Sequence, residues 1–302
     1  MDNIILILVL LLLGIGLKFI PAFPENTAQV LTSFVIYVSL PALILIQIPK
    51  LPITHEILVP ALMPWVMLAF SALLVLTCSR LFKWSRDVTG VLMLLVPLGN
   101  TSFFGIPMIE SFFGKEMVSY AILYDQFGTF LALATYGSVV VALYTGGDAG
   151  GEKATLKSIL KKIVTFPPLI ALTLAFALYS SPALPAIDFI LTPLAGTLVP
   201  LVIIAVGLKV EFRVESGHLL PMGVGLGIKL CIAPLLALGI VHLLNLNSPA
   251  ADVSIFEAGM PPQISAWALA MSVGLLPKLG AMMVGVGIII SFLTLALLFQ
   301  LL

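Results

Sequence analysis

The chain has 302 residues, of which 61% are hydrophobic and 9% are charged, and its 14 basic and 14 acidic residues give a formal net charge of zero. Soluble globular domains carry about 25% charged residues, so this composition excludes an ordinary soluble domain and indicates an integral membrane protein. The neutral balance also lacks the basic excess of nucleic-acid-binding proteins. Strands of alternating polarity are absent from the sequence, which disfavours a β-barrel and predicts an all-α fold.

Ten apolar stretches are long enough to cross about 30 Å of hydrocarbon as helices. The first stretch could be read as a signal peptide, but it starts with an acidic residue and has no small-residue cleavage site. We therefore expect it to be retained as a membrane span. The predicted spans are residues 4–22, 28–48, 57–81, 88–113, 117–144, 163–180, 187–208, 219–243, 253–275 and 279–301.

Basic residues are unevenly distributed over the loops between these spans. If the N-terminus lies outside, eleven Lys and Arg residues fall on the inner side, and two, Lys50 and Lys115, fall on the outer side. Cytoplasmic loops are enriched in Lys and Arg, so this bias predicts that both termini lie outside a cell (inner) membrane. The lysines of the long linker 145–162 would then either lie against anionic lipid or belong to a solvated cytoplasmic loop.

The two halves of the chain show matching positions. Pro41 and Pro200 are 159 residues apart, and Gly99 and Gly259 are 160 residues apart. This shared offset predicts two related five-helix repeats, and because five is odd, the second repeat must be inverted in the membrane. Inverted repeats are typical of secondary transporters. The predicted units are a first repeat, a cytoplasmic linker and a second repeat, residues 1–144, 145–162 and 163–302.

The fourth and ninth predicted spans are each interrupted near the centre. The fourth contains PLGNTSFFGIP, and the ninth contains EAGMPPQIS. Proline interrupts helical hydrogen bonding, and irregular backbone at membrane depth survives only inside protein or beside a wet cavity. Two broken helices that cross at the midplane would direct helix N-termini at one cavity, which favours an anion such as a carboxylate. The alternative is that the prolines only kink packed helices. The candidate substrate-binding residues at the breaks are Asn100, Thr101, Ser102, Gly105, Pro107, Pro261, Pro262 and Gln263.

Three ionisable residues, Asp125, Lys229 and Glu257, lie within apolar spans. A charge at the centre of a span costs about 2.5–3.5 kcal/mol on insertion scales, so such residues normally face a cavity or a partner. We expect Lys229 to form a structural ion pair, whereas Asp125 and Glu257 either join helices or carry a coupling proton. The sequence has neither the histidine spacing of a zinc protease nor a phosphate-binding glycine loop. We therefore expect no enzyme activity, no metal site and no cofactor.

Four stretches in chain order carry a resemblance to a known family: GNTSFFGIP, YDQ, IKLCIAPLL and EAGMPPQISA. They resemble the auxin efflux carrier family in its bacterial permease branch, and more distantly the plant PIN-type auxin carriers and the sodium–bile-acid symporters. The resemblance covers essentially the whole chain. It implies a homodimeric secondary carrier of small organic anions, such as malate, malonate or auxin-like acids, that works by an elevator-type movement. It also implies that Asn100 and the backbone around Pro107 and Pro261 hold the carboxylate, with Gln126 nearby.

One departure from the bile-acid symporters concerns the driving ion. Pro261 and Pro262 stand where those symporters have a polar Gln-Asn pair that helps to hold sodium. This difference favours proton-linked or electrogenic transport. Two alternatives stay open: a sodium-coupled symporter of the bile-acid type and a transporter-like membrane sensor that binds its ligand without moving it. The sequence determines neither the anion nor the direction of transport.

Overall fold

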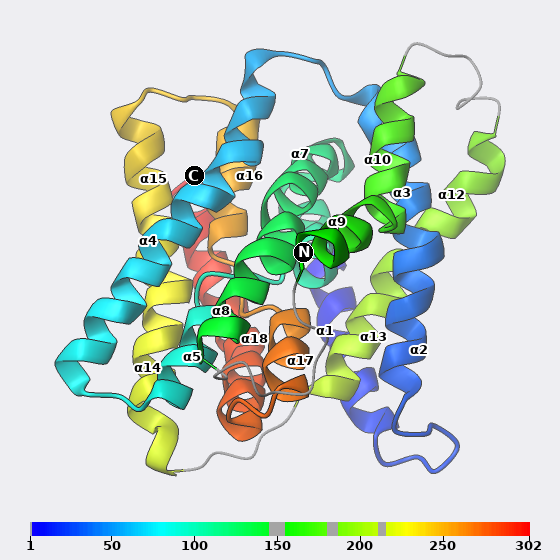
Figure 1. The fold of residues 1–302 in the computed structure, drawn as a ribbon. Coiled ribbons are helices and arrows are strands. Elements are labelled where there is room, and N and C mark those ends of the chain that lie inside the picture. Colours follow the sequence, from blue (N-terminus) through cyan, green and yellow to red (C-terminus); the bar gives the residue numbers. More distant parts are fainter. Residues whose placement is uncertain (1, 145–154, 180–186, 211–215) are drawn as a thin grey trace.

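The computed structural model describes residues 2–144, 155–179, 187–210 and 216–302, and these residues are mostly helical, with no strand among them (Figure 1). Residues 145–154 of the predicted linker lie outside the described residues, and its final residues belong to helix α9. The helices are α1 (Asp2–Leu17), α2 (Thr27–Phe34), α3 (Leu40–Gln47), α4 (Leu58–Phe82), α5 (Arg86–Leu95), α6 (Ile106–Phe113), α7 (Val118–Leu123), α8 (Ser138–Tyr144), α9 (Leu156–Val164), α10 (Pro167–Ala177), α12 (Asp188–Gly196), α13 (Leu198–Lys209), α14 (Leu219–Gly227), α15 (Ala233–Leu243), α16 (Pro249–Ala258), α17 (Ile264–Ser272) and α18 (Pro277–Phe299).

Several of these helices are joined without a turn by short segments of π-helix, in which hydrogen bonds span five residues instead of four. The continuous stretches that result are longer than the separate helix labels suggest. The π-helical segments are Val35–Ser39, Thr101–Gly105, Tyr124–Phe130, Leu133–Gly137 and Ile228–Ile232.

Within the described part of the chain, six helical stretches are long and apolar enough to cross a membrane, or seven if α9 and α10, which bend by 59°, form one span. The predicted first span corresponds to α1, which ends at Leu17 and not at residue 22. The predicted spans 88–113 and 253–275 are each divided into shorter helices, α5 with α6 and α16 with α17. The all-helical fold class is therefore confirmed for the described residues, and the number of ten spans stays a prediction. The six stretches are Thr27–Lys50, His55–Phe82, Lys115–Tyr144, Asp188–Lys209, Leu219–Leu243 and Pro277–Phe299.

The helices pack as two groups (Figure 1). In the first, which we call the panel, α1 packs on α13, α13 packs on α2, and α3 packs on α10 and α12. In the second, which we call the crossover group, α16 packs on α4 and α15, and α17 packs on α5 and α18. The panel also contacts neighbouring helical segments: α1 packs on α6, α3 packs on α7, and α13 packs on the segment Thr101–Gly105. The divided helices thus belong to the crossover group.

Small residues hold α1 against α13 in the panel. A Cβ atom added at Gly207 would lie 2.9 Å from the Cα atom of Gly14, and one added at Gly14 would overlap the backbone carbonyl of Ile204. Lipid tails are as apolar as leucine, so helices in a membrane associate through close packing of this kind. The missing side chains at these two glycines therefore allow the two helices to touch.

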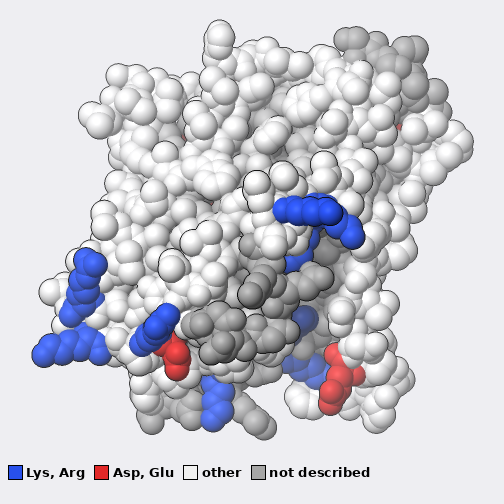
Figure 2. All heavy atoms as spheres, viewed as in Figure 1, with Lys and Arg blue, Asp and Glu red and all other residues white. Residues whose placement is uncertain are grey.

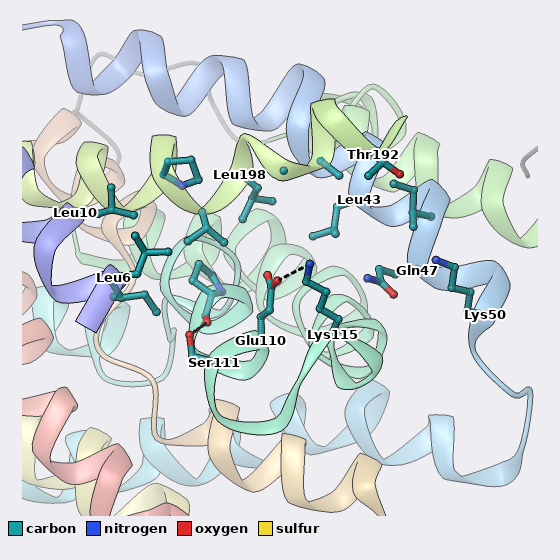
Figure 3. Close-up of a pocket in the computed structure, with 17 residues that line it drawn as sticks. Leu6, Leu10, Leu43, Gln47, Lys50, Glu110, Ser111, Lys115, Thr192 and Leu198 are labelled. Atoms are coloured by element: carbon teal, nitrogen blue, oxygen red, sulfur yellow. Dashed lines mark hydrogen bonds and ion pairs between the residues drawn. The ribbon is translucent and has the colours of Figure 1, made fainter. Parts of the chain in front are cut away.

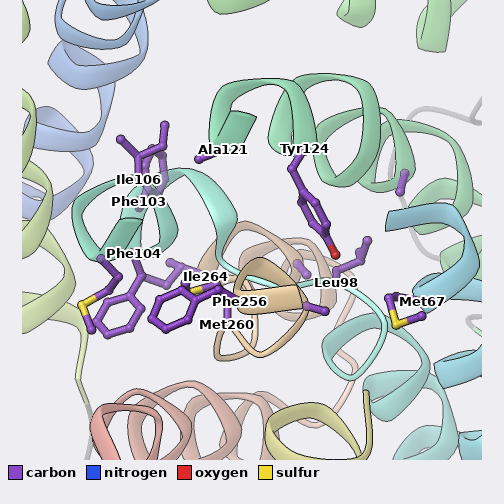
Figure 4. Packing of buried hydrophobic residues seen from close by; sticks show 14 of the residues in the cluster. Met67, Leu98, Phe103, Phe104, Ile106, Ala121, Tyr124, Phe256, Met260 and Ile264 are labelled. Carbon is purple, nitrogen blue, oxygen red and sulfur yellow. The ribbon is translucent and has the colours of Figure 1, made fainter. Parts of the chain in front are cut away.

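Aromatic packing ties the divided helices to α18. The ring of Phe256 in α16 lies 5.1 Å from the rings of Phe112 and Phe113 at the end of α6, and both of those rings lie 5.1 Å from Phe299 of α18. Nearer the break, Phe104 meets Phe292 edge to face at 5.4 Å. Figure 4 shows Phe104 and Phe256 among the buried hydrophobic residues. Edge-to-face pairs of this kind are favourable beyond the area that they bury.

Charged side chains are unevenly spread over the surface. On the face drawn in Figure 2, Lys and Arg gather over the middle and lower parts, and the upper part is almost without charge. The broad white areas match the many exposed Leu, Ile, Val and Phe side chains of the described helices. A surface that is this apolar suits contact with lipid.

We predict that Phe256→Ala destabilises the protein, because it leaves a cavity where α6, α16 and α18 meet. Phe256 is 0% exposed, and Phe→Ala substitutions in a packed interior cost about 3–5 kcal/mol. The matched control is Phe189→Ala in α12, because Phe189 is 75% exposed. Thermal unfolding of the two purified variants in detergent should show a clearly lower midpoint for Phe256→Ala alone. Equal midpoints would contradict this account of the packing.

Candidate functional site at the crossing of two broken helices

Two non-helical breaks of the crossover group cross each other. The first break is residues 96–100, between α5 and the Thr101–Gly105 segment, and the second break is residues 259–263, between α16 and α17. The backbone N–H of Asn100 donates to the carbonyl of Pro261 at 2.8 Å, and the N–H of Gln263 donates to the carbonyl of Leu98 at 3.0 Å. These reciprocal bonds form one isolated antiparallel β-bridge. The two predicted breaks thus meet, and we call this place the crossing.

Hydrogen bonding explains why the chain folds in this way at the crossing. The carbonyl of Asn100 accepts from the N–H of Gly105 at 2.9 Å, and the carbonyl of Gln263 accepts from the N–H of Trp267 at 3.1 Å, so each break leads directly into a new helical segment. The two prolines of the second break have no N–H to satisfy. A bilayer offers no partner for a free backbone group, so each break supplies partners to the other.

A buried hydrogen-bond network anchors the first break to the Tyr124–Phe130 segment. Asp125, which is 1% exposed, accepts from the hydroxyl of Thr101 at 2.6 Å and from the side-chain amide of Gln126 at 2.7 Å. These two donors fix the position of the carboxylate beside the first break. This geometry fits the interpretation of Asp125 as a residue that joins helices.

Several buried polar atoms around the crossing have no hydrogen-bond partner among the described residues. They are Nδ2 of Asn100, Oε1 of Gln126, Oε1 of Gln263 and both carboxylate oxygens of Glu257. Leaving such an atom unpaired costs about 1–3 kcal/mol, so unpaired atoms are rare in proteins. One of these atoms, Nδ2 of Asn100, is a donor and the other four are acceptors, so a bound ligand or water could pair with them.

Lys229 and Glu257 both line a small cavity at the crossing. The ammonium of Lys229 donates to the backbone carbonyl of Ala258, at the C-terminal end of α16, over 3.2 Å. Lys229 is 4% exposed and Glu257 is 0% exposed. The cavity has a volume of about 10 Å³, close to that of one water molecule measured in the same way. Its lining residues are Pro64, Leu68, Pro97, Leu98, Gly99, Thr101, Tyr124, Thr129, Ala132, Lys229 and Glu257.

Three of the π-helical segments lie at this site: Thr101–Gly105, Tyr124–Phe130 and Ile228–Ile232. They carry Thr101, Asp125 and Lys229 respectively. π-Helical turns inside longer helices are frequent at functional sites, because the extra residue per turn redirects side chains. Figure 4 shows Tyr124, the first residue of its segment, pointing from its helix towards Leu98 of the first break.

A second and larger cavity of about 610 Å³ lies between the panel and α6 (Figure 3). Leucines, among them Leu6 and Leu10, lie at one end of it, and Gln47, Lys50 and Lys115 lie at the other. Lys115 pairs with Glu110 at 3.8 Å. Ligand pockets are typically about 300–1,000 Å³ and mostly apolar, with a few polar groups, and this cavity has both properties. Its lining comes from α1, α3, α6, α12, α13 and the residues that follow α3 and α6.

Most of the predicted site residues lie together at the crossing, and one, Pro107, lies apart from them. Pro107 lies in the first turn of α6 and lines the larger cavity. Tyr124 and Thr129 also line the small cavity, and neither was among the site residues predicted from the sequence. Their place at the small cavity depends on the π-helical segment Tyr124–Phe130, which the apolar pattern of the sequence does not indicate. The residues at or directly beside the crossing are Asn100, Thr101, Ser102, Gly105, Asp125, Gln126, Lys229, Glu257, Pro261, Pro262 and Gln263.

Comparison with known proteins identifies the family to which the chain belongs. A family model described as "Membrane transport protein" matches residues 1–146 and 152–299, nearly the whole chain. The chain belongs to this family, the auxin efflux carrier family. The resemblance carried by the sequence is thereby confirmed. Together with the apolar helices, membership identifies an integral membrane transport protein.

Two curated relatives from archaea agree with this assignment. An uncharacterized transporter of Methanocaldococcus jannaschii is 30% identical over 277 residues, which cover 86% of this chain and 85% of the relative. An uncharacterized transporter of Methanothermobacter thermautotrophicus is 31% identical over 279 residues, which cover 89% of this chain and 87% of the relative. Each similarity extends over most of the length of both proteins.

We predict that Gly105→Ala disturbs the site of this auxin efflux carrier family member. The added Cβ atom would lie 2.6 Å from Oε1 of Glu257 and 2.9 Å from its Cδ, so the fully buried carboxylate would have to move. The control is Gly239→Ala in α15, where nothing lies within 4 Å of an added Cβ atom. Replacing glycine by alanine in a helix normally stabilises it by about 0.5–1 kcal/mol. Thermal unfolding should therefore show a lower midpoint for Gly105→Ala than for the control, and the reverse order would contradict the placement of Glu257.

Proposed function

We propose that the protein is a secondary carrier that moves small organic anions across the cell (inner) membrane by alternating access. The anions are carboxylates such as malate, malonate or auxin-like acids. The observation that carries this proposal is the buried Nδ2 atom of Asn100 at the crossing, which has no partner among the described residues. A carboxylate oxygen is a suitable acceptor for this donor. The helical segments that begin at the crossing add the partial positive charge of their N-termini.

The proposal includes ten spans in two inverted five-helix repeats, residues 1–144 and 163–302. The contacts around the crossing support it, because the two donors of the reciprocal bonds, Asn100 and Gln263, are 163 residues apart, and so are the two acceptors. In the panel, Ser39 and Thr197 share a hydroxyl–hydroxyl hydrogen bond of 2.7 Å across 158 residues. The helix packing is also reciprocal: α1 packs on α13, while α10 packs on α3. Two-fold relations of this kind are expected of an inverted repeat.

An elevator-type movement fits the division into a panel and a crossover group. The crossing and Glu257 lie in the crossover group, and the segments that carry Asp125 and Lys229 pack on α4 and α15 of that group. Movement of this group against the panel would therefore carry the bound anion with it. The larger cavity lies at the boundary between the two groups. Its end near Lys50 and Lys115 would attract an anion by charge. In the proposed homodimer the panel forms the interface, as the resemblance to the family implies.

The proposed orientation places both termini outside, so that the basic loops face the cytoplasm. The concentration of Lys and Arg over one part of the face in Figure 2 supports it. Transport is proposed to be proton-linked or electrogenic. Asp125 and Glu257 are the two buried carboxyl groups at the crossing that could bind a coupling proton.

We predict that proteoliposomes with the protein take up labelled malate or malonate when a pH gradient or a membrane potential is imposed. Asn100→Ala should weaken uptake at low substrate concentration by about tenfold or more, because a hydrogen bond to a charged group contributes about 1.5–3 kcal/mol. The matched control is Asn247→Ala, which changes an exposed residue before α16. This control should transport like the unchanged protein.

Three results of this experiment would count against the proposal. Uptake that requires a sodium gradient would contradict proton-linked or electrogenic transport and favour a sodium symporter. Equal losses in Asn100→Ala and Asn247→Ala would contradict the role of the crossing. Absence of uptake for malate, malonate and indole-3-acetate under every gradient would contradict a carrier for these acids and favour a membrane sensor.

A further inference from the structure

The crossing combines helix ends of both polarities. The segments that begin at residues 101 and 264 direct N-termini towards it, whereas α5 and α16 end there with their C-termini. The C-terminal carbonyl groups carry partial negative charge and attract cations. In carriers with discontinuous helices, such carbonyl groups coordinate the coupling sodium ion or proton. The C-terminal end of α16 is therefore a place where a cation is expected.

In this protein a side chain of the chain itself supplies a cation there. The ammonium of Lys229 donates to the carbonyl of Ala258 at 3.2 Å, and its side chain is almost completely buried. The same small cavity is lined by Glu257, the residue before Ala258, whose carboxylate oxygens have no hydrogen-bond partner among the described residues. A buried carboxylate needs a nearby positive charge, because burial removes the stabilisation that water would provide.

The first break and the segment after it leave room for both charged groups. A Cβ atom added at Gly99 would lie 2.9 Å from Nζ of Lys229, and one added at Gly105 would lie 2.6 Å from Oε1 of Glu257. The ammonium and the carboxylate thus occupy the space that side chains at these two positions would fill. The cavity that both residues line has a volume of about 10 Å³, close to that of a single water molecule. The positive charge of the Lys229 ammonium beside this space repels a second cation, so a sodium ion is disfavoured there while Lys229 is in place.

We propose that Lys229 is a tethered cation that takes the position of a coupling metal ion. Its single positive charge neutralises Glu257 and the C-terminal end of α16, so the crossing needs no sodium ion to hold its structure. This inference rests on the proposed function, because it takes the crossing to be the site where the anion is transported. It adds a specific role for a lysine and a reason why the site excludes sodium.

The first test measures thermal unfolding of the purified full chain in detergent, in sodium chloride and in choline chloride of equal ionic strength. The unchanged protein should have the same midpoint in both salts. Lys229→Ala should unfold at a lower temperature in choline, and sodium should restore part of the loss in a saturable manner, because the truncation opens space beside an unneutralised carboxylate. The control Lys157→Ala, which changes an exposed lysine of α9, should behave like the unchanged protein.

A second test covers the case in which Lys229→Ala does not fold. Lys229→Met and Glu257→Gln each leave one buried charge without its counterion, whereas the double variant removes both charges at similar volume. The double variant should therefore unfold at a higher temperature than either single variant.

Any of three results would overturn the inference. They are specific stabilisation of the unchanged protein by sodium, a Lys229→Ala variant that folds but does not respond to sodium, and a double variant no more stable than the less stable single variant. These experiments follow unfolding and not uptake, so they do not depend on which anion is carried. A negative uptake experiment with a positive double-variant result would reject the proposed substrates and leave the role of Lys229 in place.

Discussion

The reciprocal pair of backbone hydrogen bonds between the two breaks is the interaction on which the rest of the site depends. A helix interrupted in the middle of a membrane exposes N–H and C=O groups that lipid cannot satisfy. Here Asn100 bonds to Pro261, and Gln263 bonds to Leu98, so each interruption is satisfied by the other. Neither break would be stable without its partner, and this requirement explains why both breaks lie in one packed group of helices.

The buried charges follow from the same constraint. Asp125 is held by hydroxyl and amide donors, and Lys229 caps the C-terminal end of α16, so these two charged groups have partners in the protein. Glu257 has no hydrogen-bond partner among the described residues and lines the same cavity of about 10 Å³ as Lys229. The cost of burying charge in an apolar environment is lowest when opposite charges are close and share one enclosed space. The crossing is therefore both the most polar part of the interior and the part in which the charges compensate one another.

The aromatic cluster packs helices within the crossover group, whereas the larger cavity lies between that group and the panel. Phe112, Phe113, Phe256 and Phe299 tie α6 and α16 to α18, so the helices that carry the crossing are held in one unit. The larger cavity lies on the other side of α6, between this helix and the panel. Dense packing within a group and a cavity between groups are the properties expected of bodies that shift against each other.

The sequence by itself determined the membrane class, the all-helical fold, the position of both breaks and the family. Each of these depends on local composition, on the chemistry of proline or on a short run of residues such as GNTSFFGIP. The candidate residues at the breaks were also within reach of the sequence, because polar residues beside proline in an apolar stretch are conspicuous. Tyr124 and Thr129 were not, since their place at the small cavity depends on a π-helical turn that the apolar pattern does not reveal.

Only the tertiary structure decided which of these residues meet. The pairing of Asn100 with Pro261, the approach of Lys229 to the end of α16 and the seating of Glu257 against Gly105 join positions that are far apart in the chain. A residue spacing cannot specify such contacts, because they depend on how whole helices pack in three dimensions. The sequence predicts the two breaks, because proline interrupts a helix locally. Their crossing depends on how the helices pack.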